Sequence, residues 1–321
     1  MTSEPPINRS GAVNVFGNVL PLMNMLDPVP AVPLPDALRS LLVANPHLPD
    51  GVCRNAKPTA DAVERLAQGA LETAGASDLV GLLPPQHDGV DAVHYVASLV
   101  AYTLETPYRV YLAVTIPLNI SGERSPAALG PVLPYLKLLT VAMRLVPRDS
   151  KYWYRGTVYR GINMATAAPD LQDKVESYEA AFVPGKTEVT FAAPTSASRK
   201  DDIASTFTCG LQYVLADVEG VSLPAGDLSH YTEDEVLLCA PSVFEVVTAT
   251  KCGRTVFVML TPVATTMSYL KVPNAIPVPP QTIAWVALGD SIGDRSTTTI
   301  VDGISFSQQQ CYVKALEINV N

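Results

Sequence analysis

The chain has 321 residues, of which 48% are hydrophobic and 17% are charged, so its composition is that of a globular protein and excludes wholesale disorder. Its 22 basic and 31 acidic residues give a formal net charge of -9, without a Lys/Arg-rich run. A chain with this charge lacks the basic surface by which general nucleic-acid binders hold the phosphate backbone, and anionic lipid would repel it.

The cysteines and the first residues indicate a reducing compartment. The five cysteines are widely spread and form no C-x-x-C pair, so the sequence favours reduced thiols over a disulfide framework or a zinc site. The opening Met-Thr-Ser-Glu-Pro-Pro lacks the basic and apolar regions of a signal peptide. We therefore expect a soluble, intracellular protein, with non-standard export left open.

Residues 1–57 are rich in proline, which sustains neither helices nor central strands. We expect a partly ordered leader there, with a partner-binding arm as the alternative. The main domain is expected over residues 58–268, and residues 269–321 are expected to form a C-terminal β extension packed on it.

Helical patterns follow the leader. The first helix is expected to begin after the capping residue Thr59, to carry apolar residues at i, i+3, i+4, i+7 and i+8, and to stop at Gly75. Further helices are expected over 90–104, over 107–119, where Pro117 should break the helix, and over 131–145.

After Pro147 the pattern changes to strands, with helix candidates only at 171–182 and 201–207. Segments rich in β-branched and aromatic residues predict strands at 152–162, 187–191, 236–238, 243–250, 255–260, 283–288 and 312–320. Helices followed by strands indicate an α+β fold, because a doubly wound sheet would alternate the two.

Three acids stand at the start of the apolar strand Val236–Leu238, in the order Glu233-Asp234-Glu235. On an extended segment the side chains of Glu233 and Glu235 project to the same side and that of Asp234 projects away. Two carboxylates in one site can divide acid and base roles, whereas an isolated acidic triplet is more often a solvated turn.

Two upstream pieces change how the triplet is interpreted. Arg160-Gly161 ends an apolar strand, where a guanidinium can bind a phosphate and glycine lets a ligand approach the backbone. The segment from Phe191 to Ser198 enters a run of hydroxyl residues that can orient a carboxylate. Taken singly, each piece is more typical of a turn than of a functional site.

In this order the three pieces resemble the arginine-serine-glutamate class of mono-ADP-ribosyltransferases, which includes vertebrate ecto-enzymes and bacterial toxins. The resemblance covers about residues 90–262 and rests on Val158–Gly161, on Phe191–Ser198 for an aromatic-x-Ser-Thr-Ser motif, and on Glu233–Leu237 for a Glu-x-Glu motif. The chain departs from the pattern at Ala197, in the middle of the hydroxyl motif. A second Tyr-Arg-Gly leaves Arg155 as an alternative to Arg160, which we prefer because Thr-Val-Tyr precedes it.

The resemblance implies a split mixed or antiparallel β-sheet core that binds NAD as co-substrate, without a metal, and transfers ADP-ribose to an arginine of a protein substrate. It assigns NAD contacts to Arg160, Gly161 and Phe191, with strand-core packing as the alternative for Phe191. Ser196 would orient Glu235, the catalytic glutamate. Glu233 would position or deprotonate the acceptor, since a guanidinium is a poor nucleophile without an adjacent carboxylate.

Two other activities fit the same residues. An NAD glycohydrolase would pass ADP-ribose to water, and a catalytically idle member would only bind NAD. The histidine-tyrosine-glutamate class is disfavoured, because Arg160 stands where that class needs histidine. Neither a membrane nor a nucleic acid is expected as partner, and the target protein and oligomeric state are left open.

Overall fold

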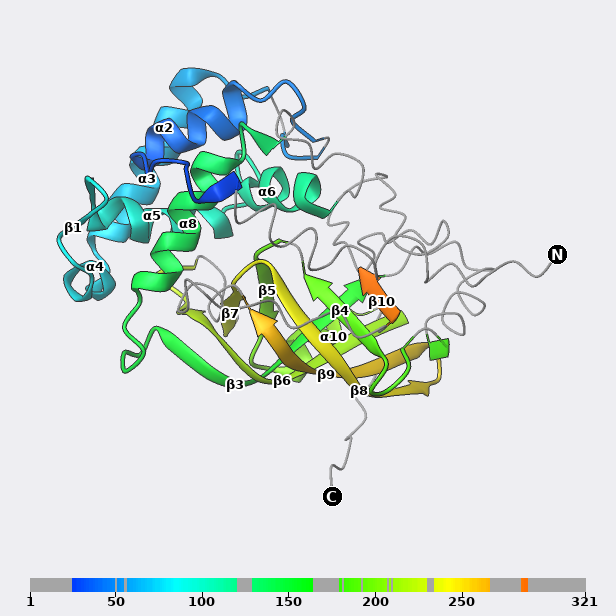
Figure 1. The fold of residues 1–321 in the computed structure, drawn as a ribbon. Coiled ribbons are helices and arrows are strands. Elements are labelled where there is room, and N and C mark those ends of the chain that lie inside the picture. The colour runs from blue at the N-terminus through cyan, green and yellow to red at the C-terminus, as the bar shows by residue number, and fades with distance from the viewer. Residues whose placement is uncertain are drawn as a thin grey trace.

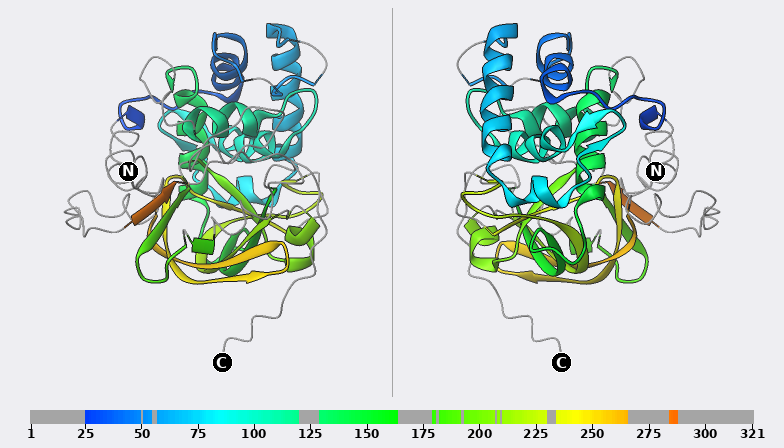
Figure 2. Two further views of the ribbon diagram at one scale, coloured as in Figure 1. Left: turned by 90° about the vertical axis from the view of Figure 1, so that its right-hand side faces the viewer. Right: turned by 90° about the vertical axis from the view of Figure 1, so that its left-hand side faces the viewer.

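The computed structural model describes residues 25–49, 51–54, 57–119, 129–163, 179–180, 182–191, 193–206, 208, 210–229, 234–265 and 284–287. The chain is arranged in two layers, with the N-terminal helices on one side and the strands on the other (Figures 1 and 2). This arrangement confirms the predicted α+β class.

The helical layer follows chain order. Its elements are α2 (Leu34–Leu38), the π-helix η2 (Arg39–Val43), α3 (Ala60–Gly75), α4 (Asp78–Leu82), α5 (Ala92–Thr103), α6 (Val110–Asn119) and α8 (Leu133–Leu145), with the short hairpin β1 (Gln86–His87) and β2 (Val90–Asp91) before α5. The predicted cap of α3 is present, because Thr59 Oγ1 accepts a hydrogen bond of 3.3 Å from Ala62 N.

The prediction that Pro117 breaks its helix is wrong, because α6 continues through Pro117 to Asn119. Proline removes one backbone donor and crowds the preceding turn, at a cost of about 3 kcal/mol. Burial outweighs this local cost, since most side chains of α6 are buried, including Leu112, Val114 and Leu118.

The strands form an eight-stranded sheet in the order β10-β4-β8-β9-β6-β3-β5-β7, with a further pairing of β6 with β7. Its strands are β3 (Trp153–Asn163), β4 (Thr187–Phe191), β5 (Thr195–Ser198), β6 (Gly210–Leu223), β7 (Glu235–Leu238), β8 (Ser242–Cys252), β9 (Thr255–Thr265) and β10 (Ala284–Ala287), and the helix α10 (Asp201–Thr206) follows β5. The pairs β10–β4 and β6–β9 are parallel and the others are antiparallel. Because β6 pairs with both β3 and β7, and β5 joins β3 to β7, these four strands close on one another.

The longest strand, β6, is absent from the sequence prediction. It contains Asp217, Glu219 and Gly220, residue types that are depleted in strands. Asp217 has φ +59° at a bulge opposite β3, a conformation that aspartate tolerates better than most residues. At Gly220 a Cβ atom would lie 2.7 Å from Leu237 O, so only glycine lets β7 approach β6 this closely.

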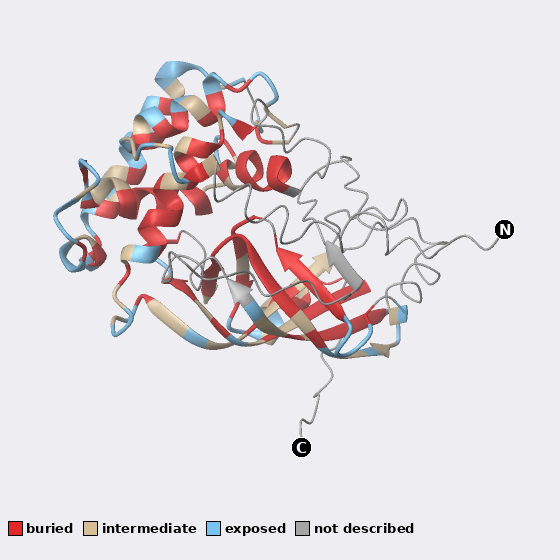
Figure 3. Cartoon of the chain, viewed as in Figure 1, coloured by how far each residue is buried: buried red, intermediate tan, exposed pale blue. Residues whose placement is uncertain are grey.

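Buried residues occur in both the helical and the strand layer (Figure 3). They form two hydrophobic clusters. The larger one, here the helical core, joins the helices to Val221, Leu223 and Leu237 of the sheet and to Ala193 between β4 and β5. The smaller one, here the strand core, includes Val158, Phe191, Tyr213 and Phe244. The expectation that residues 1–57 sustain no helix is wrong, because α2 and η2 lie there; Pro35 stands in the first turn of α2, where proline is tolerated. Side chains from Leu34 to Leu42 pack into the helical core.

Several predictions lie outside the described residues, namely the strand at 312–320, most of the helix candidate at 171–182, and Glu233. Within the described part, no helix is both long and apolar enough to span a bilayer. Cys53, Cys239 and Cys252 carry free thiols.

Candidate functional site

Three adjacent strands bring Arg160, Ser196 and Glu235 together. Strand β3 pairs with β5 at Tyr159 and Ser198, and β5 pairs with β7 so that Ser198 lies opposite Glu235. Arg160 and Ser196 are 36 positions apart in the sequence, and Ser196 and Glu235 are 39 apart. Pairing of the strands therefore converts distant positions into one local cluster.

The carboxylate of Glu235 is held by a serine. Ser196 Oγ donates a hydrogen bond of 2.6 Å to Glu235 Oε1, within the range of a charge-assisted O–H···O⁻ bond. Glu235 is only 8% exposed, although it occupies the first position of β7. Since alternate residues share a face of a strand, Glu235 lies on the same side of β7 as Leu237, which packs in the helical core.

Arg160 supports the same strand from the other side. It is 8% exposed, and its Nη1 donates to the backbone oxygen of Ser196. The guanidinium thus holds β5 beside β3 at the residue whose hydroxyl holds Glu235. The two links form a chain from Arg160 through Ser196 to Glu235.

Arg155, the alternative arginine, has a different environment. Its side chain is 67% exposed, and its Nε lies 3.8 Å from the carboxylate of Asp217, which is also exposed. It lies on β3, but its ion pair points to the bulge of β6 rather than to Ser196. Of the two Tyr-Arg-Gly arginines, Arg160 therefore lies beside Ser196, whereas Arg155 pairs with Asp217 at the surface.

Asp234 ties the start of β7 to the turn after β5. Its backbone oxygen accepts a hydrogen bond of 2.9 Å from Arg199 N. Its carboxylate lies 2.9 Å from Lys200 Nζ and 3.8 Å from Arg199 Nη2. The hydrogen bond from Lys200 lowers the pKa of Asp234; burial opposes this shift, and the charges of Lys200 and Arg199 add to it.

No family model and no curated protein matches this chain in sequence. Solved structures do match it, and several are ADP-ribosyltransferases. The type III effector XopAI from Xanthomonas axonopodis pv. citri is 12% identical, with 81% of this chain and 97% of that chain covered and a TM-score of 0.49. The Vis toxin of Vibrio splendidus, an ADP-ribosyltransferase, is 14% identical, with 68% and 93% covered and a TM-score of 0.39.

Exoenzyme S from Pseudomonas aeruginosa, solved with human 14-3-3 protein beta and carba-NAD, is 18% identical, with 62% of this chain and 88% of that chain covered and a TM-score of 0.40. At identities this low and TM-scores no higher than 0.49, these likenesses decide neither the activity nor the site residues of this chain.

The remaining predicted site residues are distributed differently. Gly161 lies in β3 opposite Gln212 of β6, next to Arg160. Phe191 ends β4 and packs edge-on against Tyr213 and Phe244, with ring centroids 5.7 and 5.2 Å away. Its side chain is 3% exposed and belongs to the strand core. The position of Glu233 is outside the described residues.

One titratable residue with an unusual environment, Glu188 on β4, has no signal in the sequence. It is 4% exposed and lies opposite Glu245 of β8. Burial, and secondarily the charge of Glu245, raises its pKa from 4.5 to about 7. Strands β8, β9 and β6 separate β4 from β3 in the sheet, so Glu188 does not join the Ser196–Glu235 pair.

Proposed function

We propose that this protein is an NAD-dependent mono-ADP-ribosyltransferase that moves ADP-ribose from NAD to a protein arginine and releases nicotinamide. The observation that supports it is the hydrogen bond from Ser196 to Glu235, formed on the strand that Arg160 fixes. Two kinds of observation support the coarser part, NAD-dependent ADP-ribosylation: several structures that this fold resembles are named ADP-ribosyltransferases, and Exoenzyme S was solved with carba-NAD.

The reaction calls for a fixed anion. The bond between the ribose C1′ of NAD and the nicotinamide nitrogen breaks, and its electron pair leaves with nicotinamide, which becomes neutral. Positive charge then develops on the ribose. A carboxylate that is already oriented and shielded from water stabilises that charge more strongly than a mobile, solvated one. Glu235, at 8% exposure and held by Ser196, meets this requirement.

The acceptor needs a base. A guanidinium nitrogen that attacks C1′ forms a new C–N bond and must lose a proton, and its ordinary pKa makes it a poor nucleophile alone. We assign that proton to Glu233, which precedes Glu235 by two positions in the chain. Arginine as the acceptor rests on this assignment.

The remaining NAD contacts belong to residues beside the pair. Arg160 supplies a positive charge for a phosphate or ribose oxygen, and Gly161 offers backbone groups to the nicotinamide amide. Phe191 borders the nicotinamide in this proposal. Its burial in the strand core fits equally a packing role without contact to NAD.

Labelled NAD tests the proposal. The wild-type protein is incubated with NAD labelled in the adenylate part, alone and with agmatine or a cell lysate, and both free nicotinamide and labelled acceptor are measured. Transfer to agmatine and to protein supports the proposal. Nicotinamide release without any labelled acceptor identifies a glycohydrolase, and NAD binding without consumption identifies an idle binder.

Two variants assign the roles. Glu235→Gln should abolish both nicotinamide release and transfer, whereas Glu233→Gln should reduce arginine modification more than NAD cleavage. Glu72→Gln, an exposed site on α3, controls for the loss of one negative charge. Undiminished transfer by Glu235→Gln contradicts the proposal, and equal loss of both activities in Glu233→Gln removes its acceptor role.

A further inference from the structure

Tyr102 of the helical layer binds the residue that precedes β5, the strand that carries Ser196. Tyr102 lies on α5 and is 3% exposed. Its hydroxyl donates a buried hydrogen bond of 2.7 Å to the backbone oxygen of Pro194. Pro194 directly precedes β5, which carries Ser196. The position of this strand relative to α5 is therefore fixed next to the proposed site.

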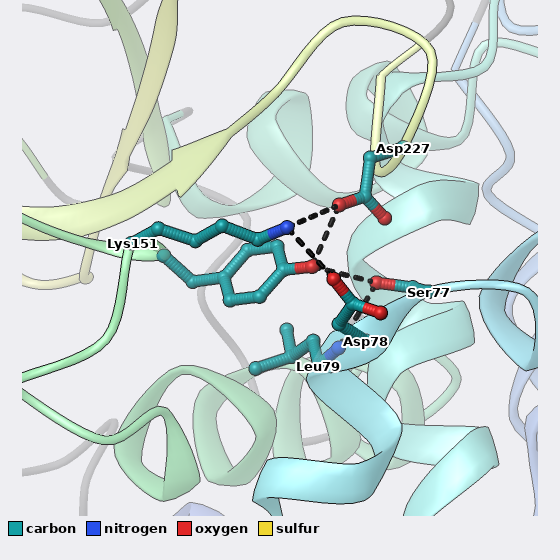
Figure 4. A network of polar contacts seen from close by, with 6 residues as sticks. Ser77, Asp78, Leu79, Lys151 and Asp227 are labelled. Atoms are coloured by element: carbon teal, nitrogen blue, oxygen red, sulfur yellow. Dashed lines mark hydrogen bonds and ion pairs between the residues drawn. The ribbon is translucent and has the colours of Figure 1, made fainter.

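A second tyrosine binds the segment that leads into β7. Tyr152 precedes β3, and its hydroxyl donates a hydrogen bond of 2.6 Å to Asp227 Oδ2 and lies 3.3 Å from Ser77 Oγ (Figure 4). Asp227 belongs to the turn between β6 and β7, and Ser77 caps α4 by accepting a hydrogen bond of 3.2 Å from Leu79 N. One hydroxyl thus joins the helical layer to the β6–β7 turn.

The surroundings of Tyr152 reinforce this link. Lys151 Nζ lies 2.9 Å from Asp78 Oδ2 and 3.9 Å from Asp227 Oδ2, so a cation also bridges α4 and the turn (Figure 4). The backbone oxygen of Tyr152 accepts a hydrogen bond of 2.8 Å from Ser222 N. Ser222 is next to Leu223, the residue that pairs with Glu235 in the sheet.

We propose that Tyr102 and Tyr152 are positioning residues that set the Ser196–Glu235 geometry from the helical layer. Tyr102 fixes the strand of the hydrogen-bond donor, and Tyr152 fixes the turn and the end of β6 beside the acceptor strand. Neither side chain needs to touch NAD. The inference rests on the proposed function, because its effect on turnover appears only if Glu235 performs the chemistry.

Small displacements at the site should matter more than the lost bonds themselves. The efficiency of positioned groups falls steeply with misplacement of the order of 1 Å. Removal of the Tyr102 hydroxyl leaves the buried Pro194 oxygen without this donor, so β5 is expected to shift or loosen at its N-terminal end. The hydrogen bond between Ser196 and Glu235 would then weaken although both residues remain.

The chain contains a matched control. Tyr135, on α8, is fully buried and donates a hydrogen bond of 2.7 Å to Ser98 O on α5. This bond has the same donor, the same class of acceptor and the same length as that of Tyr102, but both of its ends lie within the helical layer. Tyr135→Phe therefore reports the cost of losing such a bond away from the site.

The test compares Tyr102→Phe, Tyr152→Phe and Tyr135→Phe in the full chain. We expect all three to lower the melting temperature by similar amounts. Tyr102→Phe and Tyr152→Phe should lower kcat for nicotinamide release about tenfold, with KM for NAD changed less than about twofold, while Tyr135→Phe keeps both. Equal kcat losses in all three variants, or none in any, would overturn the inference.

Amide hydrogen exchange gives a second readout that does not require activity. Tyr102→Phe should raise exchange at Thr195–Ser198, and Tyr152→Phe should raise it at 225–229, whereas Tyr135→Phe should change neither segment. An inactive wild-type protein would refute the proposed function. The exchange pattern would still decide whether the hydrogen bonds of Tyr102 and Tyr152 hold β5 and the β6–β7 turn in place. Identical exchange in the three variants would refute the positioning role of Tyr102 and Tyr152, whatever the activity.

Discussion

The hydroxyl of Ser196 lies 2.6 Å from Oε1 of Glu235, across the pair of strands β5 and β7. Arg160 donates a hydrogen bond to the backbone oxygen of Ser196, and the hydroxyl of Ser196 donates one to Glu235. A carboxylate with such a partner cannot rotate freely. Its orientation is settled by the sheet before any ligand binds.

Ser196→Ala should weaken NAD cleavage without unfolding the protein. A hydrogen bond to a charged group contributes on the order of 1.5–3 kcal/mol, so loss of this bond from the transition state lowers kcat by roughly 10- to 100-fold. Nicotinamide release at saturating NAD measures the change. Ser205→Ala, which removes a hydroxyl bonded to Asp201 O on α10, serves as the control. Equal activity of the two variants would show that Ser196 does not orient a catalytic group.

Arg160→Lys and Arg155→Lys should differ although both keep the charge. Arg160 is buried and its planar guanidinium binds the Ser196 backbone, a geometry that an ammonium reproduces poorly. We expect Arg160→Lys to lose at least about tenfold in turnover and to melt a few degrees lower. Arg155→Lys should change turnover by less than about twofold, since its ion pair is exposed. The reverse pattern would assign the site arginine to Arg155.

Asp234→Asn should have little effect on turnover, in contrast to Glu235→Gln beside it. The Asp234 carboxylate pairs with Lys200 at an exposed position, and such pairs contribute roughly 0–1 kcal/mol. The backbone bond from Arg199 to Asp234 does not depend on the side chain. Turnover of Asp234→Asn should stay within about threefold of wild type, and a loss as large as that of Glu235→Gln would mean that the whole acidic segment acts as a unit.

The helices α3, α5, α6, α8 and α10 and most strands of the large sheet could be predicted from the sequence because their signals are local, whereas α2, η2 and α4 were not predicted. The Thr59 cap marks the start of α3, and β-branched residues mark Thr187–Phe191, which the structure reproduces as β4. Strand β6 could not be predicted, because it contains Asp217, Glu219 and Gly220, residue types that are depleted in strands. Gly220 makes room for Leu237 O, a requirement that exists only once β7 is in place.

The contact between Ser196 and Glu235 could be predicted only from the order of the motifs. Nothing near either residue indicates the other, because the contact depends on how β5 pairs with β7. The hydrogen bonds of Tyr102 and Tyr152 had no indication in the sequence. Tyr102 meets Pro194 across 92 positions and Tyr152 meets Asp227 across 75, and a buried tyrosine looks the same in sequence whatever its hydroxyl binds.

Glu188 should make stability depend on pH in the direction opposite to most carboxylates. Its pKa is 4.5 in the unfolded chain and about 7 when folded, so between these values the folded state binds more protons than the unfolded state. The free energy of unfolding is therefore highest, for this group, below pH 4.5 and falls as the pH rises to about 7. The loss is at most about 3 kcal/mol over that window.

Glu188→Gln should remove this dependence, because an amide keeps the shape of the neutral acid without titrating. Urea unfolding at several pH values between 4.5 and 8 measures the difference between variant and wild type, which should grow in favour of the variant as the pH rises. Glu245→Gln should give part of the same gain, since the charge of Glu245 is the smaller of the two causes after burial. A constant difference across the pH range would show that Glu188 keeps an ordinary pKa in the folded protein.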